Sequence, residues 1–304
     1  MNWRYKKEEA RLRLDSYIQA IGQAPVDSVS GSLKALQLND CEVVMFSGPP
    51  CLRLVRSAGD EQEEVTVTVA GIISDKTLPP VYQLRSTKPE HVRYLGQFVR
   101  LTGLGSHTFE ESQDRLREIF EEFRRTEGVD TLEGFEFGLY EEQYCIALHT
   151  RYLTDRRNVP GQRHIDFPAD VDPEHALEDA RDIQFIRTVD NVVQYAKKVE
   201  AQDGTARYEH LAPGEFKEGD LVEATGAFIA YPGGEAGKYK LVFALRSLAL
   251  LTSAFREESR IPKRVPDEET SRGRGSKRRR FPTATKLKRT YISYAPQGSD
   301  GTQN

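Results

Sequence analysis

The residues best placed to do chemistry are aromatic and basic side chains along a predicted C-terminal hairpin. Aromatic rings stack on the bases of a single-stranded nucleic acid, and Lys or Arg neutralises its phosphates. Two strand-like segments, 221–231 and 239–251, carry both kinds of residue, so the hairpin is a candidate binding face. The residues predicted to contact nucleic acid there are Phe228, Tyr231, Lys238, Tyr239, Lys240 and Arg246. In the alternative interpretation, which stays open, these rings fill a core.

The segment beyond residue 256 supplies further basic residues in two short clusters. The predicted site residues in these clusters are Lys277, Arg278, Arg279, Arg280, Lys286, Lys288 and Arg289. Such clusters in a polar segment are typical of nuclear import signals and of arms that bind polyanions. We therefore predict a nuclear location, an importin-type receptor as one partner, and nucleic acid as another. A solubilising tail, or a tail that folds back on an acidic body, is the alternative.

A metal site is the rival chemistry that the sequence offers. His164 and Asp166 form a His-x-Asp pair, and His210 is a distant third ligand of the kind that holds non-haem Fe(II) in oxygenases. The pair lies in a polar stretch between Pro160 and Pro168, without the strand pattern that such a site needs. A surface loop is the ordinary interpretation, and the oxygenase stays as a third hypothesis.

Other catalytic patterns are missing from the sequence. Gly103, Leu104 and Gly105 form a GxG before a predicted helix, but the third glycine and the βαβ context of a dinucleotide site are lacking. There is no GKS/T, GxSxG or HExxH motif. We therefore expect binding rather than catalysis, with no catalytic residue, no metal site and no cofactor.

The hairpin needs a body to hold it, and the pattern of that body is mostly β. Short runs at 41–46, 51–55, 65–73 and 144–152 are rich in β-branched residues and bounded by Gly, Pro or Asp. A further segment at 185–199 has ambiguous periodicity and is read as a strand or a helix.

Two amphipathic helices accompany these strands. The helix over 108–127 has an apolar stripe and a capping-box pattern in which Glu111 follows Thr108 by three residues. The helix over 3–21 places six apolar or aromatic residues near one face, namely Trp3, Ala10, Leu14, Tyr17, Ile18 and Ile21. Docking of both helices on the body is expected.

The start of the hairpin has the form of an OB-fold strand. A Gly219-Asp220 turn precedes an alternating run with a central Gly226, where such strands coil around a small barrel. Three stretches, 191–195, 216–228 and 239–248, resemble a C-terminal module in uncharacterised, lineage-expanded proteins of mushroom-forming fungi. The resemblance implies a eukaryotic protein that is not secreted and is linked to mobile elements. It implies no activity and no site residue.

Charge separates the chain into two parts. The net charge is −4, but residues 260–290 hold twelve Lys/Arg and three acidic residues, so the rest of the chain carries −13. Three cysteines without a CxxC motif are expected to be reduced thiols. No run approaches the ~20 apolar residues of a membrane span, and the charged first ten residues do not resemble a secretory signal. We expect no membrane association.

The predicted fold class is α+β, predominantly β, with one or two small OB-like barrel modules and peripheral helices. The predicted domains are an N-terminal α+β domain at 1–153, a loop or linker at 154–182, an OB-like module at 183–255 and a disordered basic tail at 256–304. The predicted function is nuclear binding of single-stranded DNA or RNA. The alternative is a protein-interaction scaffold in which the tail serves only for import.

Overall fold

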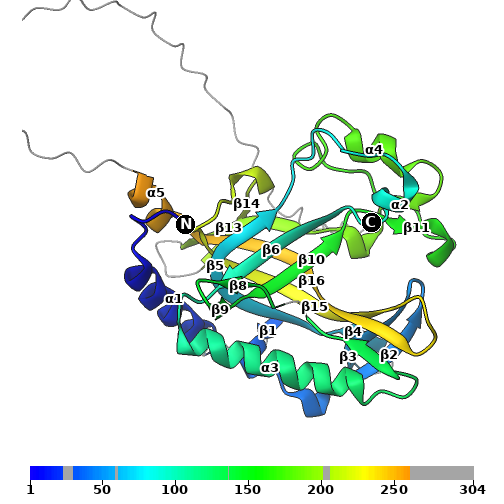
Figure 1. The fold of residues 1–304 in the computed structure, drawn as a ribbon, viewed down its shortest axis with the longest axis horizontal. Coiled ribbons are helices and arrows are strands. Elements are labelled where there is room, and N and C mark those ends of the chain that lie inside the picture. Colours follow the sequence, from blue (N-terminus) through cyan, green and yellow to red (C-terminus); the bar gives the residue numbers. More distant parts are fainter. Residues whose placement is uncertain (23–29, 59–60, 136, 201–205, 261–304) are drawn as a thin grey trace, which may run out of the picture. The chain divides into compact units, whose positions relative to one another are not determined.

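Alternating β-branched and aromatic residues form a long curled sheet with helices against it (Figure 1). The computed structural model describes residues 1–22, 30–58, 61–135, 137–200 and 206–260. The helices are α1 Lys7–Gly22, α2 Pro89–Val92, α3 His107–Arg124, α4 Ala176–Arg181 and α5 Ala254–Arg260. The strands of the first half are β1 Ser30–Ser32, β2 Glu42–Ser47, β3 Pro50–Ala58, β4 Glu61–Glu64, β5 Thr66–Thr77, β6 Gly96–Thr102, β7 Thr131–Glu133, β8 Leu139–Tyr140, β9 Gln143–Tyr144 and β10 Ile146–Arg151.

The strands of the second half are β11 Thr154–Asp155, β12 Phe185–Ile186, β13 Gln194–Glu200, β14 Ala206–His210, β15 Leu221–Pro232 and β16 Lys238–Thr252. The chain is therefore mixed α and β and mostly β, as predicted. The predicted hairpin is confirmed, because β15 and β16 pair antiparallel along their whole length. Among the described residues, no helix is both long enough and apolar enough to cross a bilayer.

Five strands form the curled part of the 12-stranded sheet, in the order β10, β6, β5, β15 and β16, with antiparallel neighbours. This part of the sheet curls so far that β10 and β16 approach each other. The hydroxyl of Thr150 on β10 donates to the carbonyl of Leu245 on β16 at 2.7 Å. A side chain therefore joins β10 to β16 across the curl.

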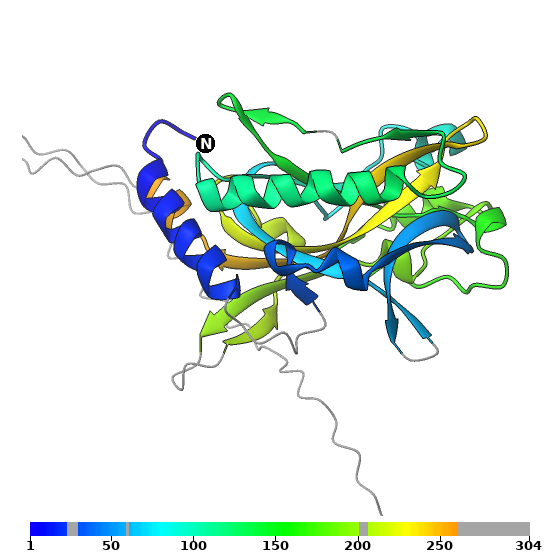
Figure 2. The same cartoon turned by 90° about the horizontal axis from the view of Figure 1, so that it is seen from below.

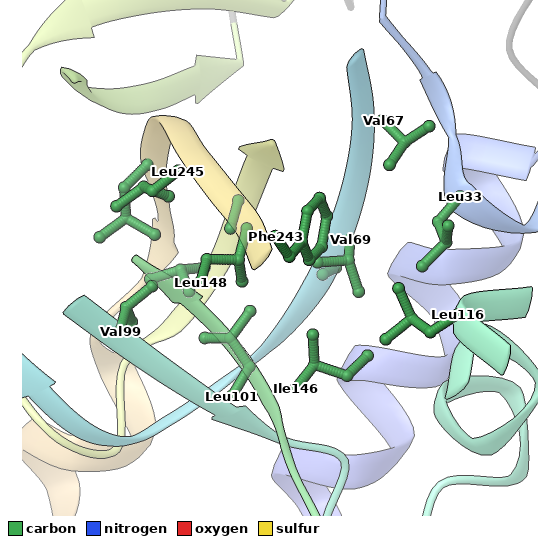
Figure 3. Close-up of a cluster of buried hydrophobic side chains, with 14 of the residues drawn as sticks. Leu33, Val67, Val69, Val99, Leu101, Leu116, Ile146, Leu148, Phe243 and Leu245 are labelled. Atoms are coloured by element: carbon green, nitrogen blue, oxygen red, sulfur yellow. The ribbon is translucent and has the colours of Figure 1, made fainter. Parts of the chain in front are cut away.

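The inside of the curled sheet holds the main core, which Figure 3 shows in close-up. Every second residue of β5, β6, β10 and β16 points inward, as strand geometry requires. The inward residues labelled in Figure 3 are Val67, Val69, Val99, Leu101, Ile146, Leu148, Phe243 and Leu245. Leu116 of α3 and Leu33 pack against them, and each fully buried side chain of this size contributes about 1.5–3 kcal/mol. Figure 2 shows α3 lying along the sheet, with α1 at one end.

Gly226 lies where the predicted strand coil was expected, and the packing there is tight. A Cβ at this position would be 2.6 Å from Phe243 and 2.8 Å from the carbonyl oxygen of Ala244. The register of β15 against β16 shifts between Thr225 and Gly226. A side chain is therefore excluded here because the two strands of the hairpin approach closely at the register shift.

The predicted module at 183–255 does not stand alone, which corrects the predicted domains. Val69 of β5 pairs with Ala224 of β15, so strands from 1–153 and 183–255 share one sheet. Residues Met1–Pro262 form one compact unit. The sequence could not show this pairing because it joins strands far apart in the chain.

The predicted linker at 154–182 also differs from the structure. Phe185 and Leu177 pack with Val92, and together with neighbouring side chains they form a second, smaller core. The predicted linker therefore belongs to a small lobe that packs against residues 81–95. The segment 154–182 is polar overall because one of its sides is exposed. Its few apolar residues lie on the other side and are too few to give a sequence pattern.

The helices differ from prediction at their N-terminal ends. Trp3 lies outside α1 and is 86% exposed, so it is not part of the buried stripe. The cap of α3 is Ser106, whose hydroxyl accepts from the amide of Phe109. Thr108, the predicted cap, instead donates to Asp15 of α1 at 2.6 Å. Ser106 also donates to Asp15, so both hydroxyls tie this end of α3 to α1.

The folded body extends slightly beyond the predicted start of the tail. Arg256 in α5 donates to Asp220, a fully buried carboxylate, at 2.5 Å. Burial raises the pKa of Asp220, and the guanidinium opposes that effect. The predicted disorder of 261–304 lies outside the described residues.

Candidate nucleic-acid interface

The predicted hairpin residues divide between two faces of the sheet. Phe228 and Tyr231 are three positions apart on one strand, so they point to opposite faces. Phe228 is fully buried and stacks on Phe243 with ring centroids 4.6 Å apart. The prediction that Phe228 binds a base is therefore wrong, because its face is the inside of the curled sheet.

Tyr239 and Lys238, at the tip of the hairpin, give little support to a stacking platform. Tyr239 is half-buried and packs against the main core. Lys238 lies 3.7 Å from Glu133 of the neighbouring strand β7. Lys240 is exposed and pairs across the strands with Tyr231, so these two share the outer face. Of the predicted hairpin set, the outer face keeps Tyr231, Lys240 and Arg246.

Arg246 belongs to an ion-pair cluster on the outer face. It lies 2.9 Å from Glu64, and its Nη2 lies 3.3 Å from Asp190. Arg53 bridges the same two carboxylates, at 2.5 Å to Glu64 and 2.6 Å to Asp190. Burial lowers the pKa of Arg53, but the carboxylates raise it more, so it stays charged. The predicted role of Arg246 as a phosphate contact is weakened, because its charge is already balanced.

Arg151 is the cation that lies between two aromatic rings. Its guanidinium carbon is 5.6 Å from the ring centroid of Tyr94 and 5.8 Å from that of Tyr231. Tyr94 is 68% exposed and Arg151 is exposed, whereas Tyr231 is half-buried. Burial, followed by the charge of Asp190, raises the pKa of Tyr231 to about 12, so its hydroxyl stays neutral. We call Tyr94, Arg151 and Tyr231 the Arg151 row.

The row lies at one end of the outer face of β6 and β10. Leu148 and Val99 point into the core, so His149, opposite Phe98, points outward. Farther along, Arg100 stands over the Phe98 ring at 5.2 Å and pairs with Asp75 at 3.1 Å. In Figure 1 these two strands lie side by side at the front of the sheet. Aromatic and basic residues thus alternate across this strand pair.

The two segments that carry Tyr94 and Arg151 are basic although the body as a whole is acidic. Residues 81–100 and 146–163 hold eight Lys/Arg and two acidic residues. One of the two acids, Asp155, is paired with Arg157 at 2.6 Å, and hydrogen bonds from that arginine lower the pKa of the carboxyl to about 2. The charge of these two segments therefore favours a polyanion.

A second cation between rings is balanced by an acid. Lys198 Nζ lies 5.0 Å from the ring centroid of Tyr17 and 5.6 Å from that of Tyr208. Glu223 lies 3.6 Å from this ammonium and accepts a hydrogen bond from the Tyr208 hydroxyl at 2.8 Å. The carboxylate disfavours a phosphate here, which distinguishes this cluster from the Arg151 row.

A groove of about 530 Å³ opens beside the row, between β2–β4 and the segment 162–190. Phe46, Val55 and Val189 line it with apolar surface, and Arg53 with its two carboxylates forms a polar wall. Phe46 and Tyr231 pack against the same small cluster of buried residues, so the row continues into the groove. We call this the Phe46 groove.

The iron hypothesis finds no support in the geometry. The Nε2 of His164 lies 3.0 Å from a Glu178 oxygen, and its Nδ1 accepts from the amide of Arg187. His210 pairs with Asp170 at 3.0 Å. Within the described part of the chain, no three His, Cys, Asp or Glu side chains gather as a metal site would require.

The tail residues predicted for binding lie outside the described residues; they are Lys277, Arg278, Arg279, Arg280, Lys286, Lys288 and Arg289. Reasoning from the sequence missed Arg151, Tyr94 and Phe46. A signal existed for Arg151, because the strand predicted at 144–152 alternates Leu148 inward with Arg151 outward. Tyr94 and Phe46 carry no such signal, since only tertiary packing brings them to the row.

Neither a protein-family model nor a curated protein matches the sequence. Among solved structures, the chain is similar to the crystal structure of gp2.5, a single-stranded DNA binding protein encoded by bacteriophage T7. The TM-score is 0.32 and the sequence identity 11%, over 68% of this chain and 100% of that chain. Because the superposition is this loose, the likeness assigns neither a fold nor a function to this chain.

Proposed function

We propose that this chain binds single-stranded nucleic acid on the outer face of β6 and β10, with the Arg151 row as its centre. The observation that carries the proposal is the position of Arg151 between the rings of Tyr94 and Tyr231. A guanidinium in this position can meet a phosphate while a base stacks on the exposed ring of Tyr94. Stacking needs an unpaired base, so a single strand is favoured over a duplex.

The proposed architecture is an OB-like barrel made of the five strands of the curled sheet. β6 and β10 are the second and third of these strands along the chain. OB folds bind oligonucleotides on the face of their second and third strands, together with the loops beside it. The loop between the first two strands, residues 78–95, contains Tyr94. The proposed site is thus in the position that an OB-like barrel uses.

We also propose that the basic tail adds affinity and directs the protein to the nucleus. Its charge opposes that of the acidic body, so it supplies phosphate contacts independent of base identity. Changing Lys277, Arg278, Arg279 and Arg280 to Ala should move a fluorescent fusion from nucleus to cytoplasm. An unchanged distribution would remove the import proposal without touching the binding site.

The direct test is a fluorescence anisotropy titration of a labelled single-stranded oligonucleotide with the full chain. Arg151→Glu removes one phosphate contact and adds repulsion, so the dissociation constant should rise about tenfold or more at low salt. Arg124→Glu is the matched control, because Arg124 is an exposed arginine on α3 that pairs with Glu121. It should bind nearly as the unmodified protein does.

Two outcomes would count against the proposal. Equal losses in both variants would mean that only overall charge matters. An Arg151→Glu protein that binds as tightly as the unmodified one would leave the row without a role, and the protein-interaction scaffold would become the better hypothesis. A duplex of the same sequence should bind more weakly than the single strand.

A further inference from the structure

The Phe46 groove adjoins the Arg151 row, so its contents bear on what the proposed function recognises. Phe46 and Tyr231 both pack against one buried cluster that contains Cys51 and Ile229, so the groove and the row meet over the same buried residues. A single-stranded nucleic acid that stacks a base on Tyr94 and passes Arg151 would therefore bring its next nucleotides to this groove. The groove volume of about 530 Å³ lies in the range of ordinary ligand pockets.

The groove suits a base better than a phosphate. Arg53 and Arg246 are each paired with both Glu64 and Asp190, so the four side chains together carry no net charge. A phosphate entering here would meet two carboxylates whose arginines are already engaged. Apolar surface from Phe46 and its neighbours favours the flat face of a base.

Counting hydrogen bonds shows what the polar wall can still accept. An ionised carboxylate has about four lone-pair sites on two oxygens. Glu64 accepts from Arg53 once and from Arg246 twice. Asp190 accepts from Arg53 twice and from Arg246 once. Each carboxylate therefore keeps one acceptor site, and both residues are about one-quarter exposed to the groove, at 26% and 24%.

We infer that the Phe46 groove takes a nucleobase of the bound strand and prefers one with an exocyclic amino group. This inference rests on the proposed single-strand binding. An amino group such as N4 of cytosine donates to a carboxylate, whereas thymine presents a carbonyl and a methyl group at the same edge. If thymine entered the groove, its carbonyl oxygen would face a carboxylate oxygen of Glu64 or Asp190. Both atoms are hydrogen-bond acceptors, so no hydrogen bond would form. Phe46 stacks on the base, and Arg163 at the groove contacts the adjoining phosphate.

The test compares oligodeoxycytidine with oligothymidine of equal length, both pyrimidine strands, at neutral pH. In competition against one labelled strand, the full chain should prefer oligodeoxycytidine by about tenfold, the size expected for one or two base-edge hydrogen bonds. If both strands bind equally, the inference is wrong and the proposed function stands. If neither binds, the proposed function fails as well.

Two variants locate the preference. Asp190→Asn replaces one acceptor oxygen by a donor and should remove most of the preference for cytosine. Gly48→Leu fills the groove without touching the ion pairs, since a Cβ at Gly48 would meet only the carbonyl of Asn158 at 4.0 Å. The Gly48→Leu variant should bind oligodeoxycytidine and oligothymidine with equal affinity, and its affinity for oligothymidine should not change. A preference for cytosine that survives in Gly48→Leu would overturn the inference even if Asp190→Asn failed to fold.

Discussion

Replacing Tyr94 by Ala should weaken single-strand binding without unfolding the protein. Tyr94 is 68% exposed, so its truncation removes little packing from the free protein. Base–aromatic stacking contributes about 1–3 kcal/mol per base, which corresponds to a rise of roughly 5- to 150-fold in the dissociation constant. The exposed cation–π contact between Tyr94 and Arg151, at 5.6 Å, stabilises the position of the guanidinium by about 0.5–1 kcal/mol. The expected loss is therefore at least about fivefold.

The salt dependence separates stacking from charge. Tyr94→Ala removes no charge, so the slope of log K against log salt should not change. Arg151→Ala should make the slope less steep by about 0.7, the single-strand value per phosphate contact. Anisotropy titrations at several salt concentrations measure both quantities.

The matched control is Tyr208→Ala, because Tyr208 is 53% exposed and also lies near a cation, Lys198. Glu223 balances that cation, so this variant should bind normally. Equal losses for the Tyr94 and Tyr208 variants, or a change in slope for Tyr94→Ala, would refute the reasoning.

Three further predictions concern the folded body. Gly226→Ala should destabilise the protein by about 1–3 kcal/mol in urea unfolding, because its Cβ meets a backbone oxygen at 2.8 Å, whereas Gly234→Ala, with nothing within 4 Å, should change stability by less than about 0.5 kcal/mol. The pKa of Asp155 falls from 3.8 to about 2 on folding, so the stability that it contributes is present above pH 4 and is lost toward pH 2. The melting temperature of Asp155→Asn should therefore lie below that of the unmodified protein at pH 4, and the difference should shrink toward pH 2. A difference that stays constant over this range would contradict the prediction. Burial raises the pKa of all three thiols and only Cys41 is partly exposed, so Ellman's reagent should label one thiol per native chain and three after unfolding.

Local patterns in the sequence were sufficient to predict the main elements. The alternation through 221–231 and 239–251 predicted β15 and β16, and the stripe at 108–127 predicted α3. At Gly226, the predicted position of a strand coil, the structure has a register shift and close packing. These features depend on neighbours in the chain, so the sequence carries them directly.

The candidate site could be predicted only in part. Parity along one strand would have placed Phe228 and Tyr231 on opposite faces, because they are three positions apart. The pairing of Arg53 with Asp190, by contrast, joins β3 to a segment far along the chain. No local pattern encodes such a contact. Arg246 pairs with the same Asp190, and that pairing weakens its predicted role as a phosphate contact.

The order of strands in the curled sheet has a consequence for the growing chain. β5 is the central strand, and one of its two long neighbours, β15, is synthesised only after β6 and β10. Until residues 221–252 leave the ribosome, the inward side chains of the first three strands have no partner hairpin to cover them. Such high contact order slows folding and leaves strand edges exposed to other chains. Ribosome-bound nascent chains that stop before β15 should therefore recruit chaperones, and chains that continue past β16 should release them.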